Sequence, residues 1–82
     1  MTAEQYEALS HELAHSGWER VLFDGGQSHT MGWTIMSVWE LESAKITLNH
    51  SEAYNVASYE IEANPAAIKW LKQNGWEQVL EA

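Results

Sequence analysis

A ten-residue pattern occurs twice in this chain and indicates where two helices end. Residues 13–22 and 71–80 are identical at six of their ten positions, and each copy places Gly-Trp-Glu after a helical stretch. A glycine readily takes the left-handed conformation that ends a helix, and the residue after it packs back on the last turn. We therefore expect Trp18 to pack on Leu13 and Trp76 on Leu71. We interpret the repeat as convergent capping rather than duplication.

Two short helices precede these endings. Residues 3–16 carry Tyr6, Leu9 and Leu13 at spacings of three and four, which places them on one stripe of a helix. The second helix is expected to begin at Asn64, an N-cap residue followed by proline. Its inward side is expected to consist of Ala67, Ile68, Trp70 and Leu71.

Strand signals occupy the middle of the chain. Residues 44–50 alternate between apolar and polar side chains, with Ala44, Ile46 and Leu48 on one face. Residues 32–40 are apolar on both faces, which is typical of a central strand. The expected strands are residues 18–24, 32–40, 44–50, 54–62 and 76–80.

The connections between these strands predict the topology. Short breaks at residues 41–43 and 51–53 join the three central strands into an antiparallel meander, and residues 24–30 read as a flexible loop. The last strand, 76–80, is a candidate for parallel pairing with the first. We therefore expect a single α+β domain over residues 1–82, in the order α-β-β-β-β-α-β, with two short helices packed on a mixed sheet.

Charge limits the partners that this domain can have. Twelve acidic residues stand against four Lys and Arg, which gives a formal net charge of −8. Nucleic acids and anionic membranes repel such a surface, because binding them relies on Lys and Arg. An acidic surface instead attracts cations or a basic protein. We therefore expect a basic protein partner and no direct contact with nucleic acid or membrane.

The absence of cysteine bears on compartment and chemistry. It excludes disulfides and thiolate chemistry, and it fits a reducing compartment. Residues 1–20 lack the charged and apolar segments of a signal peptide, and no apolar stretch is long enough to span a membrane. We therefore expect a soluble, cytoplasmic protein.

One motif carries catalytic chemistry. His11, Glu12 and His15 match the H-E-x-x-H pattern, in which two imidazoles bind zinc and the carboxylate deprotonates a bound water. On a helix, however, these histidines point away from the apolar stripe and beside Glu7, towards solvent. No family pattern places a third ligand. We therefore expect no cofactor and no enzymatic activity. A surface metal site formed by Glu7, His11 and His15 and a zinc-dependent hydrolase built on the motif are the alternative hypotheses.

The meander is expected to bring four carboxylates to one end of the sheet, because the turn at residues 41–43 and the end of the strand at residues 54–62 lie there together. Only Lys45 is nearby to offset them. Carboxylates held so close repel one another unless a cationic partner neutralises them. The candidate partner-binding residues are Glu40, Glu42, Glu60 and Glu62. The alternative is that they are ordinary solvated residues.

These observations together favour a binding protein over an enzyme. Trp33 and Trp39 share one strand face, and core packing is the expectation for each of them. The alternative is an exposed tryptophan beside carboxylates, which is typical of an interface. The leading hypothesis is a small inhibitor or modulator of a basic, nucleic-acid-handling protein, of the anti-CRISPR, anti-restriction or nuclease-immunity kind. Such a protein presents carboxylates where phosphates would bind. A homo-oligomeric scaffold module is a further alternative, and both monomer and homodimer are compatible with the sequence.

Overall fold

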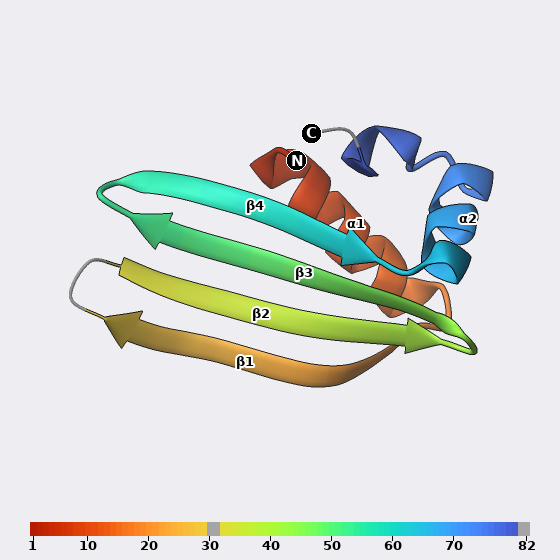
Figure 1. Ribbon diagram of the computed structural model, residues 1–82, viewed down its shortest axis with the longest axis horizontal. Helices are drawn as coiled ribbons and strands as arrows, with labels where there is room; N and C mark the ends of the chain where they lie inside the picture. The colour runs from red at the N-terminus through yellow and green to blue at the C-terminus, as the bar shows by residue number, and fades with distance from the viewer. Residues whose placement is uncertain (30–31, 81–82) are drawn as a thin grey trace.

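Two helices lie against a four-stranded antiparallel sheet (Figure 1). The computed structural model of the chain describes residues 1–29 and 32–80, with the backbone alone at residues 26–29. The sheet order is β1-β2-β3-β4, so the strands follow one another in space as they do in sequence. The predicted α+β class and the order of the first six elements are confirmed. The elements are α1 (Ala3–His15), β1 (Glu19–His29), β2 (Gly32–Leu41), β3 (Ala44–Ala53), β4 (Val56–Ala63), α2 (Pro65–Gln73) and a final 3-10 turn, η1 (Glu77–Leu80).

Side-chain caps begin both helices. The Thr2 hydroxyl accepts a hydrogen bond from the Gln5 N–H at 3.1 Å, and the Gln5 side-chain oxygen accepts one from the Thr2 N–H at 2.9 Å. The predicted cap at Asn64 is confirmed: its side-chain oxygen accepts from the N–H of Ala67 at 2.9 Å and of Lys45 at 3.0 Å. Asn64 therefore caps the start of α2, which contributes about 1 kcal/mol to helix stability. Its bond to the Lys45 N–H also connects the start of α2 to β3.

The predicted helix endings are also confirmed. Gly17 and Gly75 both adopt left-handed conformations, with φ of 86° and 80°. At the end of α2 the Trp76 N–H donates to the Leu71 carbonyl at 2.8 Å, the bond expected when a glycine follows the last turn. Trp18 is buried in the same core cluster as Leu13 and Leu71, and Trp76 packs against that cluster.

The hydrophobic core cluster lies on one face of the sheet, and Val38, which is 8% exposed, is buried on the other. β3 contributes Ala44, Ile46 and Leu48, which alternate as predicted and are at most 7% exposed. Both helices cover the face with this cluster, as Figure 1 shows, and the opposite face carries no helix among the described residues. The helices and η1 add Leu9, Leu13, Ala67, Leu71 and Val79 to the core.

The end of the chain is not the strand that the repeated pattern predicts. Residues 77–80 form η1, in which the Val79 N–H donates to the Trp76 carbonyl at 3.1 Å and the Val79 side chain is buried. β1 lies at the far edge of the sheet from β4 and α2, so parallel pairing of the last segment with β1 does not occur. The expectation of a mixed sheet was therefore wrong, because all of its strand pairs are antiparallel.

Two predicted connections lie elsewhere. The loop predicted at residues 24–30 was wrong over residues 24–29, where β1 continues through the glycines to His29. Thr30 lies outside the described residues. The break predicted at residues 51–53 is part of β3, and the turn consists of Tyr54 and Asn55 instead. Alternation of side chains simply continues through Ala53, which pairs with Val56 across the turn.

The β3–β4 turn holds a bulky side chain in a strained conformation. Tyr54 and Asn55 have φ of 53° and 64°, as a two-residue type I′ turn requires. Left-handed backbone is unfavourable for tyrosine but tolerated by asparagine. Tyr54 is 73% exposed, so little packing is lost with its ring. We expect Tyr54→Asn to raise the free energy of unfolding by about 1 kcal/mol, measured by urea denaturation. A lower urea midpoint would instead show that the ring stabilises the hairpin.

Candidate functional site

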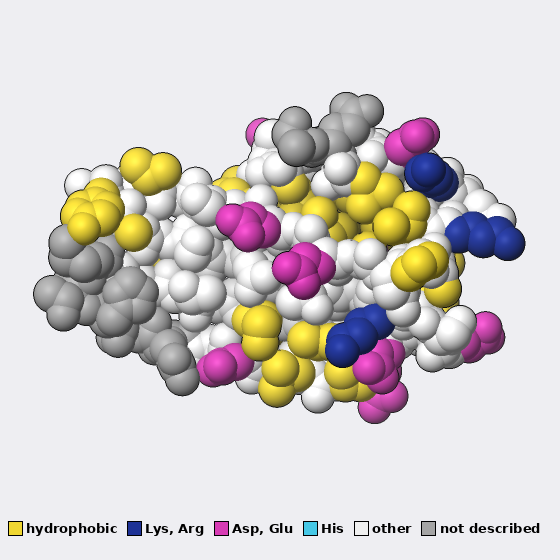
Figure 2. Space-filling model, in the orientation of Figure 1, with side chains coloured by type: hydrophobic (Ala, Val, Ile, Leu, Met, Phe, Trp, Pro, Cys, Tyr) yellow, Lys and Arg dark blue, Asp and Glu magenta, His cyan; other side chains and the backbone are white. Residues whose placement is uncertain are grey.

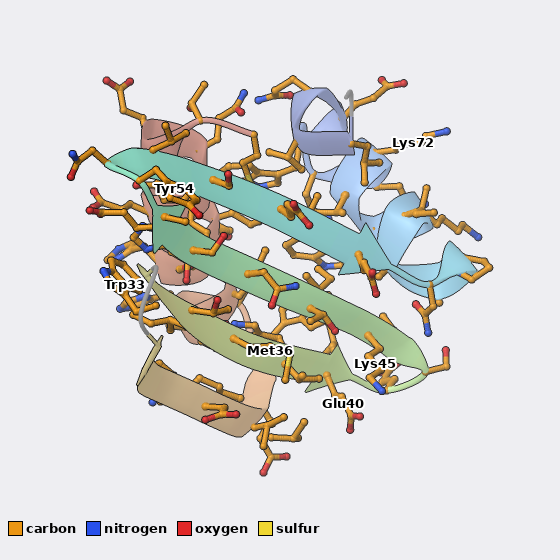
Figure 3. The ribbon with its side chains drawn as sticks, turned by 60° about the vertical axis from the view of Figure 1, so that its left-hand side comes forward. Trp33, Met36, Glu40, Lys45, Tyr54 and Lys72 are labelled. Atoms are coloured by element: carbon orange, nitrogen blue, oxygen red, sulfur yellow. The ribbon has the colours of Figure 1, made fainter. Side chains whose placement is uncertain are left out.

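The candidate surface is the sheet face that carries no helix among the residues that the structure describes. Strand register determines its members, because cross-strand partners lie on the same face. Figure 2 views the molecule from this side, and Figure 3 shows Met36, Glu40 and Lys45 projecting from it. We call it the open face and define it by Glu19, Leu22, Asp24, Thr34, Met36, Val38, Glu40, Lys45, Thr47, Asn49, Ser51, Ser58, Glu60 and Glu62.

Three of the four predicted carboxylates share the open face. Glu60 and Glu62 are exposed on β4, pairing with Asn49 and Thr47 of β3. Glu40 lies two strands away, and by strand geometry its backbone is roughly 12 Å from that of Glu62. That separation is comparable to the Debye length of about 10 Å at moderate salt, so the three act as a spread negative surface rather than as a tight cluster.

The fourth predicted carboxylate is placed differently. Glu42 lies in the β2–β3 turn with φ of 54°, and it lines a hollow on the α2 side together with Lys69 and Trp70. The hollow has a volume of about 420 Å³. Glu42 therefore lies apart from the other three, and this turn does not extend the open face.

Two carboxylates that the sequence patterns did not identify also lie on the open face. Glu19 directly faces Glu40 across β1 and β2, and Glu40 faces Lys45 on its other side. Asp24 pairs with Met36. Like charges directly opposite each other destabilise a sheet slightly, so Glu19 and Glu40 favour a cation between them. Among the described residues, the open face thus carries five carboxylates against one amine.

An apolar patch lies among these charges. The register of β1 shifts between Arg20 and Leu22, so Val21 and Leu22 together oppose Val38 of β2. Such a bulge directs both side chains towards one face. Val21 and Leu22 remain 46% and 45% exposed, next to Met36. Figure 2 shows this apolar surface bordered by acidic side chains.

The tryptophans are not part of this surface. Trp39 is buried on the helix-covered face, with its indole N–H donating to the Ser37 hydroxyl at 3.2 Å. Trp33 is on the same face, half-buried. The expected core packing is therefore confirmed for Trp39. The alternative of an exposed tryptophan beside the four predicted carboxylates is wrong, because the helices cover the face that these tryptophans occupy.

The far end of the helix-covered face holds four packed aromatic rings. His50 stacks on Tyr59 with ring centroids 4.3 Å apart, and it meets Trp33 edge to face at 4.7 Å. Tyr6 of α1 completes the group, 5.3 Å from Tyr59. Burial, with a further contribution from Tyr59, raises the pKa of Tyr6 above its ordinary value. These rings join α1 to the sheet beyond the aliphatic core.

The raised pKa of Tyr6 predicts an alkaline dependence of stability. Because the folded chain disfavours the phenolate, Tyr6 contributes stability fully below the pKa of the unfolded chain and loses it as pH rises through the folded value. We expect the urea midpoint to fall less between about pH 9 and about pH 11 in Tyr6→Phe than in the parent. Tyr54→Phe, at a largely exposed tyrosine, is the matched control; an equal effect there would rule out burial as the cause.

The H-E-x-x-H residues lie on the exposed side of α1, as expected from helix geometry. His11 and His15 are exposed with ring centroids 4.2 Å apart, and His15 Nδ1 lies 2.8 Å from the His11 carbonyl oxygen. Glu12 accepts a hydrogen bond from the Ser16 hydroxyl. Among the side chains that the structure describes, those of residues 1–25 and 32–80, no group of three or more His, Cys, Asp or Glu is arranged to hold a metal ion.

The helices and the comparisons with known proteins give two more findings. No helix in the described part of the chain has the length and apolar character needed to cross a membrane. Searches against protein-family models, curated proteins and solved structures found no match to this chain.

Proposed function

We propose that this chain is a non-enzymatic acidic modulator that binds a basic, nucleic-acid-handling protein of the cytoplasm through the open face. The observation that supports this most is the composition of that face: five carboxylates around an exposed apolar patch, on a sheet surface that no helix covers. Carboxylates steer a basic partner into encounter, and buried apolar contacts then hold it. The proposed mode of action is competition with nucleic acid, as in anti-CRISPR, anti-restriction and nuclease-immunity proteins.

A hollow on the open face offers a place for a partner side chain. It is lined by Lys45, Thr47, Glu62, Ala63 and Asn64 and has a volume of about 290 Å³. The carboxylate of Glu62 at its margin suits an arginine, whose planar fork matches a carboxylate bidentately. The hollow thus adds a specific contact to a surface that otherwise attracts by charge.

Self-association through the open face is a weaker alternative. Two copies placed face to face would bring the carboxylates Glu19, Asp24, Glu40, Glu60 and Glu62 of each towards those of the other. Like charges brought together in this way repel across an interface. The charge of the face therefore favours a basic partner over a second copy.

Retention of proteins from host extract on the immobilised chain tests the proposal. We expect a nucleic-acid-binding protein to be retained at about 50 mM salt and released at about 500 mM, because screening weakens the attraction of exposed charges. Added duplex DNA or RNA should release it as well, since both compete for the same basic surface. A partner released by neither salt nor nucleic acid would contradict charge mimicry, as would retention of this chain alone.

A further inference from the structure

We infer that the outer edge of β4 is a strand-addition site, which takes an extended segment of the basic partner with alternating basic and apolar residues. The inference rests on the proposed function for its partner, and it adds the conformation and sequence pattern of the segment that binds. It depends on three features of β4: an unbroken ladder, outward backbone groups at Tyr59 and Ile61, and a groove beside them.

The two edges of the sheet differ in their readiness to pair. β1 has register shifts between Arg20 and Leu22 and again between Asp24 and Gln27. Bulges bend an edge strand and interrupt the row of backbone groups that another strand would need. β4 pairs with β3 in an unbroken register from Val56 to Ala63. Only the β4 edge therefore presents a regular row of hydrogen-bonding groups.

The direction of the backbone groups follows from one hydrogen bond. The Asn64 N–H donates to the Lys45 carbonyl at 3.1 Å, which points this residue towards β3. In an antiparallel ladder the groups alternate, so Glu62 and Glu60 also point inward, and Tyr59 and Ile61 present their N–H and C=O outward. No other described element forms a backbone hydrogen bond with this outer edge.

A groove runs beside these outward groups. It has a volume of about 320 Å³ and is lined by the apolar side chains of Met1, Ile61, Val79 and Leu80 together with Tyr59, Glu60 and Glu62. An added strand would direct alternate side chains towards the apolar residues of this groove and the others to the open face of the sheet. On the open face the nearest side chains are those of Glu60 and Glu62. The fitting segment therefore alternates aliphatic residues with lysine or arginine.

The negative charge of Glu60 and Glu62 determines which kind of strand can pair with the outer edge of β4. Pairing of this edge with the same edge of a second copy would place the carboxylates of Glu60 and Glu62 within a few strand spacings of their copies. Like charges so placed destabilise a sheet, whereas Lys or Arg at the same positions would stabilise it. The site is therefore suited to a basic chain and not to self-pairing.

A designed peptide tests this directly. The probe is an eight-residue peptide of alternating lysine and valine, capped at both ends, and binding is followed at low salt by titration and by amide hydrogen exchange of the protein. We expect the amides of Tyr59 and Ile61 to exchange fast in the free protein and to become protected in the complex. The amides of Glu60 and Glu62, which point towards β3, serve as internal controls that are protected in both states.

Backbone methylation of the peptide supplies a matched pair of controls. One version carries N-methyl groups on its valines and the other on its lysines, so charge and composition are equal. In either pairing only one kind of residue points its backbone N–H groups towards β4. These are the valines if the peptide pairs antiparallel and the lysines if it pairs parallel. We expect methylation of the residues that point towards β4, and of those alone, to weaken binding by about tenfold or more, because at least two hydrogen bonds are lost.

Several outcomes would overturn the inference while leaving the proposed function intact. They are equal binding by both methylated peptides, equal weakening by both, unchanged exchange at Tyr59 and Ile61, or no binding of the parent peptide. The proposed function is decided separately, by release of the nucleic-acid-binding partner on adding salt or nucleic acid.

Discussion

Reversing three charges of the open face, Glu40→Lys, Glu60→Lys and Glu62→Lys together, should abolish retention of the basic partner. The variant replaces three attractive carboxylates with three repulsive amines at the surface where the partner docks. Like-charge juxtaposition at an interface costs several kcal/mol, which corresponds to a loss of affinity of at least about a hundredfold. The measurement is the amount of partner retained at low salt, compared between the parent and the variant.

A control with equal net charge separates local from global electrostatics. The variant Glu7→Lys, Glu42→Lys and Glu77→Lys also changes three exposed residues, but all three lie off the open face. It should keep most of the binding, and both variants should unfold within about 1 kcal/mol of the parent. Equal loss of binding in the two variants would mean that net charge, and not this face, attracts the partner.

The largest effect on stability should come from Ile46→Ala. Ile46 has no exposed surface and lies on β3 in the same core cluster as residues of both helices, opposite Trp39 of the neighbouring strand. Removing its branched side chain leaves a cavity that the packed helices cannot fill, which typically costs about 2–5 kcal/mol. In a domain of this size each kcal/mol lowers Tm by roughly 4–8 °C. Thermal unfolding followed by circular dichroism measures the shift.

Thr47→Ala is the control for the core substitution. Thr47 is the next residue on the same strand, half-buried on the open face. Its substitution should change the free energy of unfolding by less than about 1 kcal/mol, since no core cavity forms. A comparable loss in both variants would contradict the assignment of the core cluster to one face.

The sequence was sufficient to predict the parts of this fold that depend on local chemistry. Asn64 followed by proline, the glycines after each helix, and the alternation of Ala44, Ile46 and Leu48 are each interpretable without knowledge of the rest of the chain. The alternation along residues 54–62 likewise indicates that Tyr59 and Ile61 face inward and that Glu60 and Glu62 face outward, and the strand register agrees. That half of the open face was accessible from pattern alone.

The part of the open face that β1 contributes could not be predicted from the sequence, because bulges change which side chains share a face. Simple alternation from Glu19 would put Asp24 on the helix side, but the bulge at Val21 moves Leu22 and Asp24 to the open face. Gly25 and the residues after it read as a loop although they continue β1. The turn at Tyr54 and Asn55 contains no glycine, and tyrosine is typical of strands, so the sequence pattern did not indicate a turn there. Each error has the same origin: tertiary pairing overrides local preference.

The asymmetry of the two sheet edges has a consequence for assembly. Open-ended fibres grow when one surface of a molecule accepts a complementary surface of the next copy and the contact repeats without closing. Here β4 has a regular edge, but the only other edge that the described strands offer, that of β1, is interrupted by bulges. Because no second regular edge is available to dock on β4, strand addition stops after one event. The sheet should therefore form a complex of one-to-one stoichiometry and resist polymerisation even at high concentration.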